Sequence, residues 1–232
     1  MEWPEIDVLI PTYNRAVILD STLRALCRHL RYSGMLRFHV GVDGNDDPTW
    51  NMLERIIVDG IPVNAYTGPH RGLGTNLNML IGKAQSDFLF QLDDDHHLLE
   101  PLNLDKHVRQ LIENDDAGWI RLMGIGGHSY QASLRGTYWY IDWNSHGDYS
   151  LYIPSMRPHL KHRRFHQYYG MYPEGKKLGE TEEAFCHQCI DTYNARKYNT
   201  TEGEAPFVLV PLNSNSETAW AHVGDSWQGK GL

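Results

Sequence analysis

The first hundred residues alternate between short apolar runs and longer stretches in which apolar residues recur every three or four positions. Short apolar runs are typical of buried strands, and the three-to-four spacing is typical of helices with one buried face. Strands are expected over residues 7–10, 37–42, 62–66 and 87–92, and helices over 16–31, from Pro48 onwards, and over 76–84. This alternation predicts an α/β fold with a Rossmann-like, mostly parallel, doubly wound sheet.

The second half of the chain is less regular. A helix is expected over 104–114, and strands are expected over 119–123 and 137–143. No internal repeat, low-complexity tract or linker divides the sequence. We therefore expect residues 1–232 to form a single domain whose second half elaborates the carboxyl edge of the sheet.

Composition narrows the class of protein. The 232 residues are 41% hydrophobic, which is enough for a substantial core, and the net charge of −8 argues against nucleic-acid binding through bulk electrostatics. There is no run of about 18 apolar residues and no signal-like N-terminal segment, which predicts a soluble, cytoplasmic protein with no membrane span. Three cysteines, Cys27, Cys186 and Cys189, cannot form a disulfide framework, in keeping with a reducing compartment.

The apolar run at 88–92 stops at three consecutive carboxylates, Asp93, Asp94 and Asp95. Open α/β sheets bind ligands beyond the carboxyl ends of their strands, and carboxylate oxygens suit hard divalent cations. Acids in this position can equally form a solvated turn or cap a helix. Because further polar loops follow the other predicted strands, we expect a binding site at this edge of the sheet.

Four segments in this order resemble the family 2 glycosyltransferases, which have the nucleotide-diphospho-sugar transferase fold called GT-A. The matching segments are Val8-Leu-Ile-Pro-Thr-Tyr-Asn-Arg15, Val42-Asp43, Arg71-Gly-Leu-Gly-Thr-Asn76, and Leu92-Asp-Asp-Asp95 as the Asp-x-Asp motif. They span roughly residues 6–101. Beyond them, the resemblance is limited to the acidic segment 179–185 and the late histidine His222.

The resemblance implies a metal-dependent, inverting transfer of a sugar from a nucleotide-diphosphate sugar, with UDP as the expected nucleotide. Residues 1–101 would bind this donor, and residues 102–232 would bind the acceptor. Asp95 is expected to bind Mn²⁺ or Mg²⁺, with His222 as a second protein ligand and His96 or His97 as alternatives to it. Asp93 is expected to face the ribose or a metal-bound water, with Asp94 beside it.

The same resemblance assigns residues to the nucleotide. They are Pro11, Thr12, Tyr13, Arg15, Asp43 and Arg71. The loop at 11–13 is expected to meet the base and ribose, and Asp43 to accept a hydrogen bond from the base. Arg71 would face the diphosphate or ribose. Asp43 could instead be a turn residue in the Asp-Gly sequence. Arg15 could cap the surroundings of the first helix instead of contacting phosphate.

Inverting transfer also requires a base that takes the proton from the acceptor hydroxyl. The resemblance places it in the acidic segment at the start of a helix and favours Glu183. Glu182 and Glu180 remain alternatives, because the family often has Glu-Asp where this chain has Glu-Glu. Acids are also favoured in a first helical turn by the helix dipole, without any chemical role.

Two other functions remain open: a nucleotidyltransferase, and a non-catalytic sugar- or nucleotide-binding module. A nucleotidyltransferase would be expected to have a Gly-rich, basic loop after the first strand, which this chain lacks.

A saccharide is the expected acceptor of the sugar. A hydroxylated base in DNA is a minority alternative that depends on the basic segment 159–166, which can also be a solvated face.

Two further motifs have ordinary structural interpretations. Cys186-His-Gln-Cys189 is weak evidence for zinc, because no second pair of cysteines accompanies it. The aromatic residues Trp139, Tyr140 and Trp143 could form a stacking floor for an acceptor, although aromatic residues in a strand more often belong to the core.

Overall fold

The computed structural model describes residues 2–123, 132–143, 153–177, 179–196, 205–211 and 219–223. Its elements, in chain order, are β1 (Ile6–Thr12), α1 (Ala16–His29), β2 (Leu30–Arg31), β3 (Leu36–Asp43), α2 (Asp47–Val58), β4 (Val63–Gly68), α3 (Leu73–Lys83), β5 (Phe88–Gln91), β6 (His96–Leu98), β7 (Leu102–Asn103), α4 (Asp105–Glu113), β8 (Ala117–Arg121), β9 (Ala132–Arg135), β10 (Tyr138–Ile141), β11 (His159–His162), α5 (Arg164–Tyr169), α6 (Glu180–Arg196), β12 (Phe207–Pro211) and β13 (Trp220–His222).

A nine-stranded sheet in the order β4-β3-β1-β5-β11-β8-β12-β10-β9 runs through the molecule. The four strands β4, β3, β1 and β5 pair in parallel, and β8 pairs in parallel with β12. Only β11 and β10 run against the common direction within this described sheet. The α/β, mostly parallel fold class predicted from the sequence is therefore confirmed.

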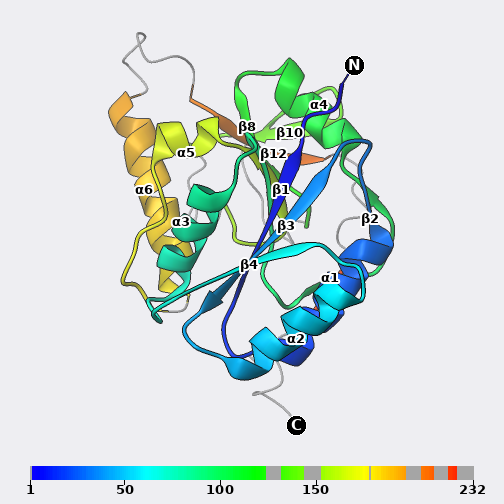
Figure 1. Ribbon diagram of the computed structural model, residues 1–232. Helices are drawn as coiled ribbons and strands as arrows, with labels where there is room; N and C mark the ends of the chain where they lie inside the picture. Colours follow the sequence, from blue (N-terminus) through cyan, green and yellow to red (C-terminus); the bar gives the residue numbers. More distant parts are fainter. Residues whose placement is uncertain are drawn as a thin grey trace.

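Helices cover both faces of the sheet, as Figure 1 shows for α3, α5 and α6 on one side and α1, α2 and α4 on the other. Consecutive strand residues point to opposite faces. In β5, Phe88 and Phe90 therefore join the core under α1, α2 and α4, and Leu89 joins the core under α3, α5 and α6. Burial on both faces explains why these strands are continuous apolar runs in the sequence.

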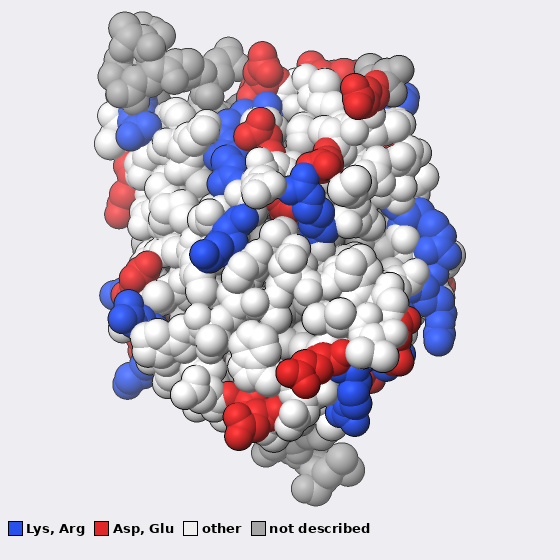
Figure 2. All heavy atoms as spheres, in the orientation of Figure 1, with Lys and Arg blue, Asp and Glu red and all other residues white. Residues whose placement is uncertain are grey.

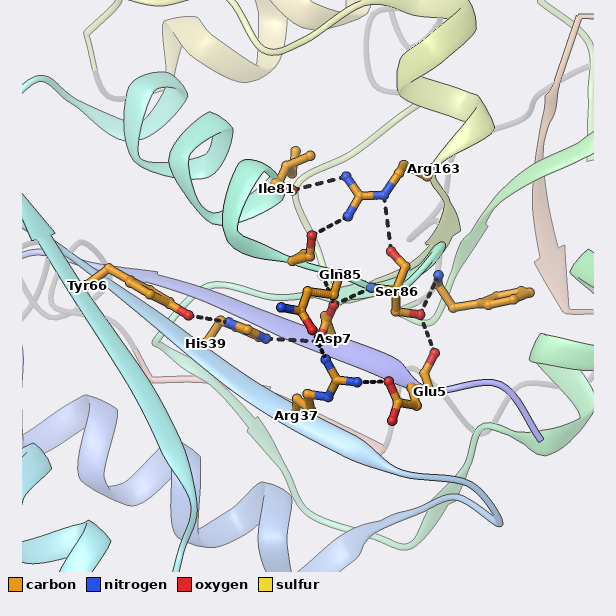
Figure 3. Close-up of polar contacts among 11 residues, drawn as sticks. Glu5, Asp7, Arg37, His39, Tyr66, Ile81, Gln85, Ser86 and Arg163 are labelled. Atoms are coloured by element: carbon orange, nitrogen blue, oxygen red, sulfur yellow. Dashed lines mark hydrogen bonds and ion pairs between the residues drawn. The ribbon is translucent and has the colours of Figure 1, made fainter. Parts of the chain in front are cut away.

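Strand β1 is fixed at its start by a fully buried carboxylate, Asp7 (Figure 3). Its oxygens accept the backbone N–H groups of Gln85 at 2.6 Å and Ser86 at 2.7 Å, and lie 2.9 Å from His39 Nε2. Burial raises the pKa of Asp7, but the bond to His39 and the two backbone bonds outweigh burial, so the pKa lies below its ordinary value. This network anchors the sheet at the edge opposite to the predicted site.

The basic segment 159–166 is not a surface patch. It forms β11, inserted between β5 and β8, and the start of α5. Arg163 donates to the carbonyls of Ile81, Ala84 and Ser86 at the end of α3, in the view of Figure 3. The neighbouring arginine, Arg164, donates to carbonyls at the end of α4 and in β8. These cations satisfy helix C-termini instead of facing a polyanion.

Lys161, in the same segment, is fully buried in the core. Its Nζ donates to Gln91 Oε1 at 2.7 Å and Tyr172 Oη at 2.8 Å, and lies 4.8 Å from the centroid of the Trp119 ring. Figure 2 shows acidic and basic side chains interspersed with uncharged surface on the face in view. The segment 159–166, on which the DNA alternative depended, therefore offers no basic surface to a polyanion.

The two other motifs also belong to the core. Tyr140 and Trp143 are each 2% exposed and pack in the clusters on opposite faces of the sheet, so they do not form one stacking floor with Trp139. Cys186 and Cys189 are buried, free thiols in α6. Within the described ranges, no helix is both long and apolar enough to cross a membrane.

Candidate functional site

A pocket of about 550 Å³ opens at the carboxyl edge of the parallel strands β1, β3 and β5. Its lining residues are Pro11, Thr12, Tyr13, Arg15, Asp43, His70, Gly72, Leu73, Asn76, Asp93, Asp94, Asp95, Met156, Lys176, Lys177, Gly179, Glu182 and His222. Parallel strands end at the same edge, so the loops that follow them converge here. The structure brings the predicted site residues together in this pocket, with the exception of the Arg71 side chain and Glu183.

The acidic cluster is held by residues at the end of β1 and just after it. Thr12 Oγ1 donates to Asp94 Oδ2 at 2.5 Å, and Arg15 Nη1 lies 3.1 Å from Asp94 Oδ1 and 2.9 Å from Asp95 Oδ2. From the first helix, Thr22 Oγ1 donates to the Asp94 carbonyl at 2.5 Å. Asp94 is therefore fixed as a bridge between the loop after β1 and the turn after β5.

Negative charge is in excess at this point of the pocket. Burial raises the pKa of Asp93 well above its ordinary value, and the carboxylates of Asp95, Asp94 and Glu182 raise it further. Burial also raises the pKa of Asp94 to about 6, against the lowering effect of Thr12 and Arg15. Four acids with one arginine between them favour the binding of an additional cation.

Asp95, His96 and His222 form a possible metal site, since one donor atom from each residue lies within 4.8 Å of the others. His222 Nε2 is 3.3 Å from Asp95 Oδ2, and His96 Nδ1 is 3.4 Å from Asp95 Oδ1. Burial lowers the pKa of His96 to about 4, against the opposing effect of Asp95. A neutral imidazole is the form that binds metals.

Unpaired buried atoms give an independent indication of a missing partner. Asp95 Oδ1 and His96 Nδ1, which face each other, are buried and have no hydrogen-bond partner among the described residues. Leaving a buried polar atom unpaired costs about 1–3 kcal/mol, so such atoms rarely gather without a ligand. The donor set of carboxylate oxygen and imidazole nitrogen fits a divalent cation.

The opposite end of the pocket presents a stacked aromatic pair. The rings of Tyr13 and His70 lie with centroids 4.3 Å apart and an interplanar angle of 19°. Asp43 Oδ1 accepts the Arg71 backbone N–H at 2.9 Å, and Asp43 Oδ2 accepts that of Gly72 at 3.0 Å. Gly72 permits this turn because its φ is +85°, a conformation that other residues rarely adopt.

Asp43 and Arg71 thus differ from their expected environments. Asp43 lines the pocket, and its carboxylate also fixes the backbone at Arg71 and Gly72. It is the last residue of β3, which differs from the turn role that the sequence left open. Arg71 donates its backbone N–H to Asp43. Its side chain is exposed, and Arg71 is not among the described residues that line the pocket. His70, whose Nδ1 is 2.9 Å from Asp43 Oδ2, was missed although it stands next to Arg71 in the sequence.

The acidic segment presents one carboxylate to the pocket. Glu182 lines the pocket, and its Oε1 accepts the Met156 backbone N–H at 2.8 Å. Glu183 is exposed and lies 3.9 Å from His187 on the outer side of α6. Glu180 accepts the Lys177 N–H at 3.1 Å. The geometry therefore favours Glu182 over the predicted Glu183.

Lys176 and Lys177 are pocket residues that the sequence analysis missed. They lie in the segment just before α6, and this segment packs closely on α3. A Cβ atom at Gly74 would come within 2.1 Å of the Pro173 carbonyl oxygen. The only sequence signal for these lysines is their position directly before the acidic segment, which had been noticed for its acids alone.

Comparisons with known proteins agree with this arrangement. The chain matches the family described as Glycosyl transferase family 2 over residues 7–195. Among solved structures, S. aureus TarS 1–349 in complex with UDP-GlcNAc is similar with a TM-score of 0.60 and 15% identity, over 93% of this chain and 56% of that one. The mannosyltransferase PcManGT from Pyrobaculum calidifontis, in complex with GDP-Man and Mn²⁺, gives a TM-score of 0.56 and 14% identity, over 90% and 57%.

The extent of these similarities limits what they show. This chain spans a little over half the length of those two structures. At such low identity, the structural similarity shows a shared fold and says nothing of substrates. No curated protein matched the chain.

Proposed function

The chain belongs to glycosyl transferase family 2, and on that premise we propose that it transfers a sugar from a nucleotide-diphosphate sugar to an acceptor hydroxyl. The observation that carries the proposal is the single pocket that joins a stacked aromatic pair, a cluster of acids with nearby histidines, and a pocket-facing glutamate. Transfer from such a donor requires these three parts: a surface for the nucleobase, charged groups for the diphosphate, and a general base that takes the proton from the acceptor hydroxyl.

The nucleotide would lie along the end of the pocket formed by Tyr13, His70 and Asp43. Tyr13 offers a ring for stacking, and the unused lone pairs of Asp43 can accept from a nucleobase N–H. The UDP and GDP sugars bound by the structurally similar proteins have such N–H groups. We propose UDP as the nucleotide, following the resemblance of the sequence.

The diphosphate would lie between the lysines of one wall and the acids of the other. Lys176 and Lys177 place positive charge at the pocket, and Arg15 reaches the acids from the loop after β1. Asp95 and His222 would hold Mn²⁺ or Mg²⁺, which when bound supplies charge that stabilises the departing diphosphate. Asp93 would face the ribose or a water molecule of this ion.

We assign the catalytic base to Glu182. Its carboxylate faces the pocket, one oxygen is fixed by the Met156 N–H, and the other can accept the proton of an acceptor hydroxyl. Attack from the side opposite the diphosphate inverts the configuration at the anomeric carbon, which is the stereochemistry that the family resemblance implies. A saccharide remains the proposed acceptor.

Matched variants of the two adjacent acids test this assignment. Glu182→Gln is expected to bind donor within about twofold of the wild type but to lose at least about 100-fold in transfer, the usual contribution of a general base. Glu183→Gln should remain within a few-fold of the wild type. Loss of transfer in Glu183→Gln alone would move the base to Glu183.

The donor is found by thermal stabilisation of the purified chain with UDP, GDP and their sugars, in Mn²⁺, Mg²⁺ or chelator. A ligand that binds only the folded state raises the melting temperature by mass action. Stabilisation by a nucleoside diphosphate and its sugar is expected. Stabilisation by nucleoside triphosphates alone would support nucleotidyl transfer, and binding without turnover would support a non-catalytic module.

A further inference from the structure

The short ladder between β6 and β13 pairs two histidines across from one another. His96 and His222 are direct register partners, and their rings lie with centroids 5.0 Å apart. Side chains of directly opposed residues project to the same face of a ladder. His97, the next residue in β6, therefore projects to the other face, where it contacts the backbone of Ile18.

The distance from each histidine to Asp95 suits coordination better than hydrogen bonding. Two atoms bound at about 2.1 Å from one ion lie about 3.0 Å apart at a right angle and about 3.4 Å apart at a tetrahedral angle. The observed pairs are 3.3 Å for His222 with Asp95 and 3.4 Å for His96 with Asp95. The latter exceeds an ordinary N–H···O bond, and neither atom of that pair has another partner.

The two oxygens of Asp95 have different neighbours. Arg15 and His222 both lie near Oδ2, and Oδ1 lies near His96 alone among these groups. His96 and Asp95 are each only 4% exposed, so bulk water does not satisfy them. His96 Nδ1 is thus a third donor atom, and it approaches the Asp95 carboxylate from the buried side of the site.

Resting on the metal-dependent transfer proposed above, we infer that His96 is a third protein ligand, and that the Asp95–His96–His222 set selects a transition ion such as Mn²⁺ over Mg²⁺. Mg²⁺ prefers oxygen ligands and strict octahedral geometry, whereas first-row transition ions accept imidazole nitrogen. Two imidazoles with one carboxylate disfavour Mg²⁺. A site of Asp95 and His222 alone would discriminate less.

The test measures metal binding by the full chain without any nucleotide. Mn²⁺ binding is followed by electron paramagnetic resonance, with Mg²⁺ as competitor, and Co²⁺ binding by its visible absorption. His96→Ala is expected to weaken Mn²⁺ binding at least about tenfold, to change Mg²⁺ binding by less than about threefold, and to shift the Co²⁺ spectrum. His97→Ala is the matched control and should change none of these.

A second variant keeps the test decisive if His96→Ala does not fold. His96→Gln supplies an amide oxygen in place of a ring nitrogen, so the preference for Mn²⁺ over Mg²⁺ should fall while a folded melting transition is retained. Unchanged Mn²⁺ affinity in both variants, or an equal loss for both ions, would overturn the inference, because a merely structural role weakens both alike. Absence of metal binding by the wild type would overturn it as well.

Assays of sugar transfer distinguish a failure of this inference from a failure of the proposed function. Transfer that is equally fast with Mg²⁺ and Mn²⁺ and unaffected in His96→Ala would overturn the role of His96 and leave the transferase standing. Ion selectivity that depends on His96, without turnover of any nucleotide sugar, would support the site and reject the transferase.

Discussion

A single methyl group at Gly74 is expected to disturb both stability and donor binding. Gly74 lies in the first turn of α3, and a Cβ there would come within 2.1 Å of the Pro173 carbonyl oxygen and 3.0 Å of its carbon. Ordinary contact requires about 3.5 Å, so the two backbones would have to separate by more than about 1 Å. The segment that begins at Pro173 carries Lys176 and Lys177 to the pocket.

The magnitude follows from two opposing effects. Alanine is favoured over glycine in a helix interior by about 1 kcal/mol. Overpacking costs about 1–3 kcal/mol, and a clash between two backbones lies at the upper end because no flexible side chain can yield. Gly74→Ala should therefore lower the free energy of unfolding by about 2 kcal/mol. For a chain of this size, that corresponds to a fall of about 4–8 °C in melting temperature.

Gly82 provides the matched control in the same helix. It is exposed, and a Cβ there would meet nothing within 4 Å. Gly82→Ala should raise the free energy of unfolding by up to about 1 kcal/mol through helix propensity alone. Urea and thermal unfolding measure both variants, and calorimetry with UDP and Mn²⁺ should show weaker binding in Gly74→Ala only. A Gly74→Ala protein as stable as Gly82→Ala would refute the reasoning.

Two buried ionisable groups give predictions that depend on pH. Asp7→Asn should cost about 2–3 kcal/mol at pH 7, because the charged carboxylate accepts from His39 and from the backbone of Gln85 and Ser86. Since the pKa of Asp7 is below its ordinary 3.8, this stability is present above pH 3.8 and is lost as pH falls through the folded value. Urea unfolding should therefore show the difference from wild type narrowing in acid; a constant difference would contradict the assignment. Burial lowers the pKa of Lys161 well below 10.5, so the unfolded chain binds a proton that the folded chain releases, and stability rises with pH between the two values. Lys161→Met should abolish that rise without loss of stability at pH 7; an unchanged slope in urea unfolding would show that the amine is not responsible.

The first half of the fold could be predicted because its signals are local. β1 and β5 are buried on both faces and are therefore apolar runs, and each helix there has a three-to-four periodicity. Strand β4, at the edge of the sheet, is only partly buried. The triple aspartate could be placed at the carboxyl edge for the same reason. β11 gave no such signal, since the sequence His-Leu-Lys-His resembles a solvated segment. Its burial depends on Tyr172 and on Gln91, which satisfy Lys161, and Gln91 lies 70 positions away in the chain.

The details of the site depend on contacts that the sequence does not encode locally. Neighbouring residues in a helix point about 100° apart, so which of Glu182 and Glu183 faces the pocket depends on how α6 docks against the sheet. The sequence placed His222 near the metal by resemblance but did not reveal that His96 is its register partner. That pairing joins residues more than a hundred positions apart, across a two-stranded ladder too short to give a periodic pattern.

The sheet order has a consequence for the chain during its synthesis. β5 pairs with β1 on one side, but its other neighbour, β11, comes from residues 159–162. At roughly 5–20 residues per second, the ribosome needs several seconds to make the intervening segment. Throughout that interval, the Phe-Leu-Phe-Gln strand has an unpaired apolar edge, the kind of surface that templates aggregation. The nascent chain should therefore depend on chaperones until β11 emerges.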